Sequence, residues 1–312
     1  MKIPLDYHYA PSVFARAPDF AADPLYVVGG LYGNLAALDE VDRLAGEEGA
    51  TVVFNGDFHW FDAVPDWFVE IEQRIACQRA LRGNVETELA RAIDIGAGCG
   101  CAYPASVAAG VVRRSNEILI ELRRTAQAVP GAAERLAALP MHLVADVGGT
   151  RVGIVHGDAT SLAGWSFAQD ALDAPTAPGM LSGVHRAAGV DVFACTHTCL
   201  AVLRDFQLPS GRLTIVNNGA AGMPNFSGSR FGVISRMATT PSPHRSLYGV
   251  VRRGVHIDAI ALDYDCDAFL ARFLSRWPSG TAAHASYFQR ITRGPDYPLE
   301  QAVPVTAAAA YA

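Results

Sequence analysis

At the start of the chain, short apolar runs typical of strands alternate with a segment whose apolar residues are spaced as in a helix. The stretch "VVGGLYGNLAALDEV" at 27–41 begins as a strand and passes through a tight turn into a helix. In that helix Leu35, Leu38, Val41 and Leu44 recur about every three positions and form one apolar face. The β-branched run in "ATVVFNGDFHWFD" then predicts a second strand. Strand, helix and strand in this order favour a parallel sheet with right-handed crossovers.

The second half of the chain is patterned mainly as strands. "HLVADVGGTRVGIVHGD" predicts two strands that meet at a glycine pair, "VDVFACTHT" a strand entering a loop, and "LRDFQLPSGRLTIVNNGA" a hairpin. No repeat or long linker separates the two halves. We therefore predict one α/β domain over residues 1–278, in which residues 94–139 are an insertion with a cysteine-bearing loop and helical pattern. Residues 279–312 are predicted as a weakly patterned tail that is partly disordered or docks on the body.

Composition narrows the classes of partner. Half of the 312 residues are hydrophobic, which is ample for a sizeable core. The net charge of −6 and the scattered Lys and Arg residues argue against nucleic acid as a partner. The N-terminus lacks the apolar core of a signal peptide and no run approaches a membrane-spanning length, so we expect a cytoplasmic protein without a membrane partner. The six cysteines form no regular framework and are expected as reduced thiols.

Polar residues suited to a divalent metal follow four successive strand-like or turn-forming runs. Asp57 lies in "NGDFH", Asn84 in "RGNVETE", His156 in "VHGDAT" and His197 in "CTHTC". In open α/β sheets such strand ends converge at one edge, where ligands bind. One carboxylate, one amide oxygen and two imidazoles form a mixed set that suits Mn, Fe or Zn rather than Ca. Taken singly, each residue has an ordinary structural explanation, such as a cap, a turn or a hydrogen-bonded core histidine.

The order of these motifs resembles that of the calcineurin-like metallophosphoesterases: D-x-H, G-D, G-N-H-D or G-N-H-E, H, and G-H-x-H. The match spans roughly residues 25–222 and includes "GNLAAL" after the first motif and "VNNGAAGMP" after the last. The resemblance implies a four-layer α-β-β-α sandwich, with two mixed sheets flanked by helices. It also places Asp57 on the family's bridging aspartate, and Asn84, His156 and His197 on the ligands of its second metal.

The first metal site of the family is altered in this chain. Its aspartate position holds Gly30, its histidine position holds Tyr32, and the second histidine of the last motif is Cys199. Family members activate a water between two metals, whereas a single ion still acts as a Lewis acid. Two interpretations are open: Tyr32 and Cys199 fill the space of a lost ion, or they bind one themselves through a phenolate and a thiolate. We predict one divalent metal, and favour a vestigial first site.

A further departure concerns proton transfer. The G-N-H-D histidine, which usually protonates the leaving group or stabilises the transition state in the family, is Val85 here and is followed by Glu86. His59, two residues beyond Asp57, is the nearest substitute as acid, base or extra ligand, and is equally interpreted as an exposed loop histidine.

Other side chains are candidates for substrate binding or for orienting ligands. Arg82, directly before Gly83, suits an anionic substrate because its fork makes two bonds at once, although it is equally placed to pair with the helix that follows. Glu86 and Asp158 are candidates to support the metal ligands, and Asp158 is alternatively a cap. Cys99 and Cys101 form a C-x-C pair that is predicted as a lid or structural loop, with metal ligation as the alternative.

These observations predict a metal-dependent phosphoesterase-like hydrolase, a phosphomonoesterase or phosphodiesterase, that acts on a small phosphorylated molecule. Asp57, Asn84, His156 and His197 would hold the metal, and His59, Asn84 and Arg82 are the candidate catalytic residues. The alternatives are a non-catalytic member that binds metal or phosphate for regulation, and a rebuilt metal site with different chemistry. The sequence does not predict the substrate or the oligomeric state.

Overall fold

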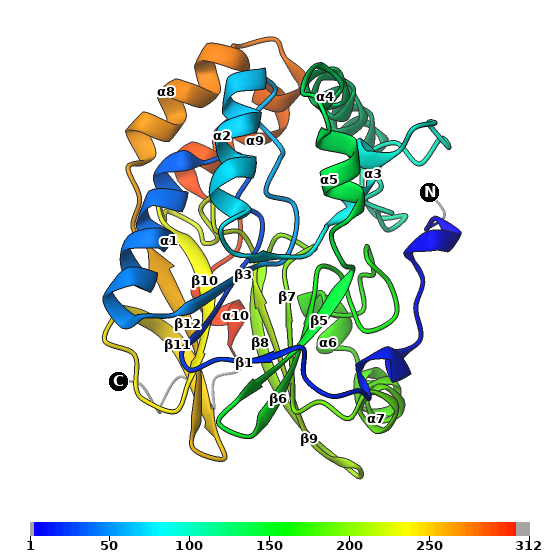
Figure 1. The fold of residues 1–312 in the computed structure, drawn as a ribbon, viewed down its shortest axis with the longest axis vertical. Helices are drawn as coiled ribbons and strands as arrows, with labels where there is room; N and C mark the ends of the chain where they lie inside the picture. The colour runs from blue at the N-terminus through cyan, green and yellow to red at the C-terminus, as the bar shows by residue number, and fades with distance from the viewer. Residues whose placement is uncertain (1–2, 304–312) are drawn as a thin grey trace.

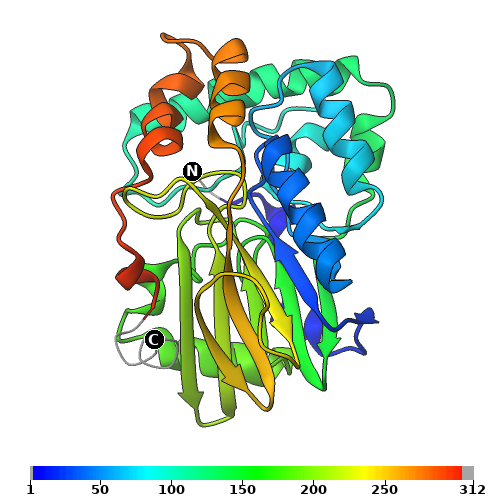
Figure 2. The same ribbon diagram turned by 90° about the vertical axis from the view of Figure 1, so that its left-hand side faces the viewer.

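The computed structural model describes residues 3–303 of the chain. Two sheets pack face to face, and helices cover the outer face of each (Figure 1). The predicted four-layer α-β-β-α sandwich of two mixed sheets flanked by helices is confirmed. Seen from the side, a group of helices also gathers beyond one end of the strands (Figure 2). Within residues 3–303, no helix is long and apolar enough to cross a membrane.

Each sheet has six strands, and both mix parallel and antiparallel pairs. The first sheet has the order β1-β5-β6-β7-β9-β8, with strands at Phe20–Ala21, His142–Val147, Thr150–Val155, Val192–Cys195, Gly211–Asn218 and Ala201–Leu208. The second has the order β11-β12-β10-β2-β3-β4, with strands at Ser246–Arg252, Val255–Leu262, Gly232–Ala238, Leu25–Val28, Thr51–Phe54 and Arg79–Ala80. The predicted parallel pairing of the first two long strands is confirmed, because Leu25 of β2 lies opposite Thr51 of β3.

Alternation along the strands sorts side chains into separate apolar layers. In β2, Leu25 and Val27 join the layer between the two sheets, whereas Tyr26 and Val28 join the layer under the helices of the second sheet. A third layer separates the first sheet from α7 at Ala177–Ala188. Three apolar layers between four layers of secondary structure therefore explain why these strands are apolar at nearly every position.

The first long helix begins and ends at residues with clear capping roles. Helix α1 at Leu35–Glu48 starts at Asn34, whose side chain accepts a bond from the Ala37 backbone, and ends at Gly49 in the left-handed conformation. The remaining α-helices are α2 at Pro65–Ile75, α3 at Asn84–Ala90, α4 at Ala109–Ala128, α5 at Ala132–Ala137, α6 at Gln169–Leu172, α8 at Cys266–Arg276, α9 at Ala282–Arg293 and α10 at Leu299–Ala302. Two 3₁₀ turns, at Leu5–Tyr7 and Pro11–Phe14, precede them.

The end of the chain was predicted to be partly disordered or to dock on the body. Within residues 279–303 the structure has two helices, α9 and α10, and α9 docks on the body. Helix α9 packs against α4 and α8, and Ala283 and Ile291 are buried in the same core as α1 and α2. Residues 304–312 of the predicted tail lie outside the described part. Because α9 docks here, its residues Tyr287 and Arg290 border the candidate site.

Candidate metal centre

The four predicted metal ligands come together at the ends of neighbouring strands. Asp57 follows β3, Asn84 is the first residue of α3, His156 follows β6 and His197 follows β7. All four are nearly inaccessible to solvent, with exposed fractions of 7% for Asp57, 0% for Asn84 and His156, and 5% for His197. Segments from both sheets thus meet at one buried point, as the order of motifs predicts.

Four acceptor atoms face one another at this point. The Nε2 atom of His156 lies 3.0 Å from Asn84 Oδ1, 3.1 Å from His197 Nδ1 and 3.4 Å from Asp57 Oδ1. Atoms bound at about 2.1 Å to one ion are themselves about 3.0 Å apart in an octahedron and about 3.4 Å apart in a tetrahedron. The spacing therefore fits a single first-row divalent ion.

Hydrogen bonds on the far side of each group fix which atoms face the centre. His156 Nδ1 lies 2.9 Å from the Asn55 carbonyl oxygen, and His197 Nε2 lies 3.1 Å from that of Cys101. A carbonyl oxygen only accepts, so these ring nitrogens carry the protons and the facing nitrogens carry lone pairs. The Asn84 amide donates to the Cys99 carbonyl at 2.8 Å, which turns its own oxygen inward. With both imidazoles neutral, the four facing atoms therefore offer lone pairs to a cation.

The local charges agree with this arrangement. Burial by itself lowers the pKa of His156, but the Asp57 carboxylate raises it above its ordinary value. Burial and the nearby His156 lower the pKa of His197 to about 3, so this imidazole is neutral at physiological pH. Burial opposes ionisation of Asp57, yet the two imidazoles hold the pKa of its carboxyl below the usual range. The centre thus favours an ionised carboxylate beside positive charge.

Glu86 fixes the turn that presents Asp57. Its buried carboxylate accepts backbone N–H bonds from Asp57 at 2.8 Å, Phe58 at 3.0 Å, His59 at 3.2 Å and Gly83 at 2.8 Å. The approach is close enough that a Cβ atom at Gly83 would lie 2.3 Å from Asp57 Oδ1. Glu86 therefore holds the backbone on either side of the candidate ligand Asp57.

The positions of the family's first metal hold a different arrangement. The Tyr32 hydroxyl lies 3.0 Å from Cys199 Sγ. A Cβ atom at Gly30 would meet the Tyr32 ring at 2.9 Å, so the ring lies where a side chain at position 30 would begin. Burial raises the pKa of the Tyr32 hydroxyl well above its ordinary value, and burial also raises that of the Cys199 thiol. A neutral phenol and thiol therefore occupy this half of the centre.

Backbone strain concentrates around the same centre. Among residues 3–303, five non-glycine residues have positive φ, and these include Tyr32 at 55°, Asp57 at 53°, Ala102 at 48° and Cys199 at 59°. The left-handed conformation costs such residues about 1–2 kcal/mol each. Strain gathered at one place and held by the surrounding packing is characteristic of functional sites.

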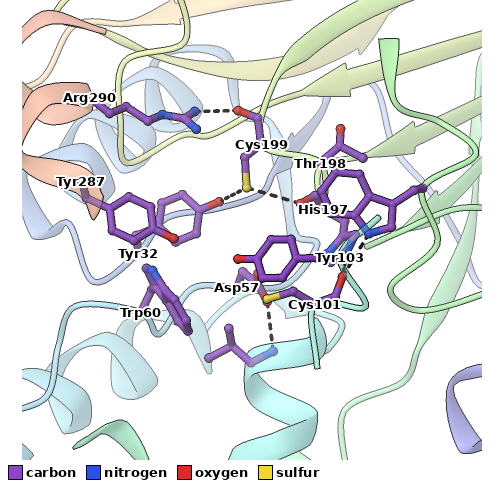
Figure 3. Close-up of a pocket in the computed structure, with 12 residues that line it drawn as sticks. Tyr32, Asp57, Trp60, Cys101, Tyr103, His197, Thr198, Cys199, Tyr287 and Arg290 are labelled. Carbon is purple, nitrogen blue, oxygen red and sulfur yellow. Dashed lines mark hydrogen bonds between the residues drawn. The ribbon is translucent and has the colours of Figure 1, made fainter. Parts of the chain in front are cut away.

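A pocket of about 180 Å³ opens onto the ligands (Figure 3). Asp57 and His197 form part of its floor, and Val85 lines it where the family motif has a histidine. Its walls carry five aromatic side chains, namely Tyr32, Trp60, Tyr103, Trp165 and Tyr287. Arg290 supplies the single Lys or Arg side chain among the twelve described residues that line it.

Two predicted catalytic residues do not reach this pocket. His59 is fully buried, lies 2.5 Å from the Asp62 carboxylate through Nδ1 and stacks on Phe68 at a centroid distance of 3.7 Å. The interpretation of His59 as an exposed loop histidine is therefore wrong, and its ring does not line the pocket above the candidate metal ligands. The guanidinium of Arg82 donates to the Ala137 carbonyl at 3.0 Å and does not line the pocket.

The remaining predicted residues have structural contacts. Asp158 accepts bonds from the backbone of Thr160 and Ser161, so it caps the loop after His156, as the alternative interpretation held. The cysteine loop lies over the ligands, with its carbonyls at Cys99 and Cys101 orienting Asn84 and His197. This placement matches the lid interpretation.

The sequence analysis missed Arg290 and the aromatic walls. Arg290 and Tyr287 lie three residues apart on α9, in the segment interpreted as a tail. This spacing is typical of two side chains on one face of a helix, and it was the signal in the sequence that could have indicated them. The Arg290 guanidinium donates to the Cys199 carbonyl at 2.6 Å, which ties this helix to the altered motif. Trp60 and Trp165 lie near predicted motifs, but nothing in their spacing marks them as parts of one pocket.

Comparison with known proteins supports the fold. No protein-family model and no curated protein matches the sequence. Among solved structures, a hypothetical protein from Pyrococcus horikoshii OT3 has a TM-score of 0.57 and 16% identity, covering 88% of this chain and 99% of that one. A metallophosphoesterase from Sphaerobacter thermophilus has a TM-score of 0.53 and 14% identity, covering 87% of this chain and 100% of that one. The chain therefore has the metallophosphoesterase fold, as the order of its motifs indicates.

Proposed function

We propose that this protein is a phosphoester hydrolase that uses one divalent metal ion. The observation that carries the proposal is the convergence of four lone-pair atoms, from Asp57, Asn84, His156 and His197, around one buried point. The fold supports the reaction class, since the structurally similar protein from Sphaerobacter thermophilus is described as a metallophosphoesterase. Mn, Fe and Zn all suit a mixed nitrogen and oxygen ligand set.

The protein's own groups divide the remaining tasks. A bound divalent ion would supply Lewis-acid stabilisation of negative charge on the phosphate. Arg290 is the lining cation, and the carbonyls of Cys199 and Pro224 accept its hydrogen bonds and hold its guanidinium in place. A planar guanidinium suits a phosphate oxygen pair. We therefore assign to Arg290 the anion-binding role that the sequence suggested for Arg82.

One observation favours a second candidate function, namely binding without catalysis. Tyr32 and Cys199 contact each other and close the half of the centre where a second ion would bind, and burial raises the pKa of both groups, which favours their uncharged forms. A protein with this centre could bind a phosphate group through one ion and Arg290 without turning it over.

Metal content and turnover measured together test the proposal. Protein purified without chelator should hold about one equivalent of metal, measured by mass spectrometry. It should release phosphate in Mn from a panel that includes glycerol phosphate, phenyl phosphate and diphenyl phosphate. Asp57→Asn should abolish turnover while its circular dichroism spectrum stays native. Absence of bound metal would refute the proposal, and metal without turnover of any substrate would establish the binding function instead.

A further inference from the structure

The aromatic walls and the polar floor of the pocket have different chemistry. Trp60, Tyr103, Trp165 and Tyr287 come from four segments far apart in the sequence, yet all border the same 180 Å³ space. Figure 3 shows Tyr287 and Tyr103 on different sides of the space above Asp57. A cavity of about 150 Å³ accommodates benzene, so this pocket has room for one aromatic ring above the metal ligands.

The polar atoms of Tyr103 and Trp165 are already hydrogen-bonded within the protein. The Tyr103 hydroxyl lies 2.9 Å from Ser115 Oγ, and the Trp165 indole donates to the Cys101 carbonyl at 3.0 Å. The rings of Tyr287 and Trp60 contact each other edge to face at a centroid distance of 6.3 Å. The walls therefore present mainly hydrocarbon surface, which favours a ring over the hydroxyl groups of a sugar or of glycerol.

Among the twelve described residues that line the pocket, no imidazole or carboxyl group outside the candidate metal centre is available to protonate the leaving group. Position 85 is valine, His59 lies elsewhere, and among the twelve lining residues His197 is the one imidazole and Asp57 the one carboxylate. Both of these belong to the metal centre. An alkoxide leaves poorly without a proton, because its conjugate acid has a pKa close to the 15.7 of water. A phenoxide, with a conjugate acid of pKa about 10, leaves far more readily.

Together these features indicate a substrate class, and this inference rests on the proposed hydrolase function. We propose that the pocket selects phosphoesters whose leaving group is a small aromatic ring. Water adds to phosphorus and gives up one proton to solvent, the bond from phosphorus to the aryl oxygen breaks, and the electron pair leaves with the aryloxide. The aryloxide then takes up a proton from solvent, so the products are a phenol and the corresponding phosphate. Stacking on the walls holds the ring, and the ion and Arg290 hold the phosphate.

Binding of phosphonates tests the aromatic subsite without turnover. In Mn, phenylphosphonate should bind at least tenfold more tightly than methylphosphonate by calorimetry. Tyr103→Leu and Tyr287→Leu should each reduce this ratio severalfold, whereas Tyr103→Phe and Tyr287→Phe, which keep the rings, should largely preserve it. Melting curves identify any variant that fails to fold. Equal binding of the two phosphonates by the wild-type protein would overturn the inference.

Turnover tests the leaving-group argument. Across a series of substituted phenyl phosphates, kcat/KM should fall at least tenfold as the pKa of the phenol rises from about 7 to about 10. Glycerol phosphate should be at least a hundredfold slower than phenyl phosphate. If glycerol phosphate is turned over as fast and this turnover requires Asp57, the aromatic preference is refuted while the hydrolase function stands. If no substrate is turned over, the hydrolase function itself is refuted.

Discussion

The two halves of the candidate metal centre line the same pocket but differ in chemistry. In one half, the facing atoms of His156, His197 and Asn84 lie close to one another beside Asp57. Backbone carbonyls fix the orientation of the two imidazole rings. In the other half, neutral side chains contact each other. The first half is built to surround a cation. The second is filled by the contacting side chains of Tyr32 and Cys199, so packing takes the place of an opening there.

The difference also shows that the substitutions in the second half depend on one another. Gly30 leaves the room that the Tyr32 ring occupies, and the hydroxyl of that ring meets the thiol of Cys199. An aspartate at position 30 would collide with this ring unless position 32 changed as well. The altered motifs therefore form one packed unit, which supports a vestigial first site over a rebuilt one.

Removal of a ligand from the intact half should have the largest effect. We expect His156→Ala to weaken metal binding by more than a hundredfold, because it removes a central ligand and leaves the remaining lone pairs poorly spaced. Titration calorimetry with Mn measures this change. Cys199→Ala, in the other half, is the matched control and should alter the affinity less than threefold. A loss of one of two bound equivalents in Cys199→Ala would instead establish a rebuilt first site.

A change behind the ligands should have the next largest effect. Glu86→Gln keeps the size of the side chain but replaces one acceptor oxygen by a donor amide, which opposes the backbone N–H groups of Asp57 and Gly83. We expect metal affinity to fall about 10- to 100-fold, as is usual when support for a ligand is lost. Exposed Glu47→Gln is the control and should leave affinity unchanged. Unaltered affinity in Glu86→Gln would show that the turn holds its shape without the carboxylate.

The packing of the altered half is tested by restoring the family residues one at a time. Gly30→Asp alone should destabilise the fold by about 2–3 kcal/mol, because it adds a left-handed non-glycine residue and a clash with the Tyr32 ring. Adding Tyr32→His should recover at least 1 kcal/mol by removing the clash. Urea denaturation of the single and double variants measures this coupling. Additive effects would contradict the proposed packing unit.

Much of the fold follows from sequence patterns, because adjacent strands and helices obey local periodicity. The strands near residues 27 and 53 and the hairpin at 201–218 are all present. Strand β10 and helix α9 were missed, since the reasons for both are tertiary. Strand β10 pairs with β2 and β12, which lie far from it in the chain. Helix α9 is held by its contacts with α4 and α8.

The order of the motifs predicted the candidate site only for residues that directly follow successive strands. Asp57, Asn84, His156 and His197 follow strands whose ends the topology brings together, and the structure places their acceptor atoms around one point. His59 illustrates the limit of proximity in sequence. It lies two residues from Asp57, but the left-handed turn at Asp57 and the bond to Asp62 direct its ring into the core. Side-chain direction within a turn is not encoded by spacing.

The smallest expected effect concerns the reactivity of Cys199. Burial raises the pKa of this thiol above its ordinary value of 9.0, so little thiolate is present at neutral pH and the fraction increases as the pH rises. We expect alkylation by iodoacetamide at pH 7.5 to be severalfold slower at Cys199 than at the exposed Cys77, and to accelerate above pH 9. Peptide mass mapping assigns each site. Rapid modification at pH 7.5 that zinc prevents would identify Cys199 as a thiolate ligand and make the two halves of the centre alike.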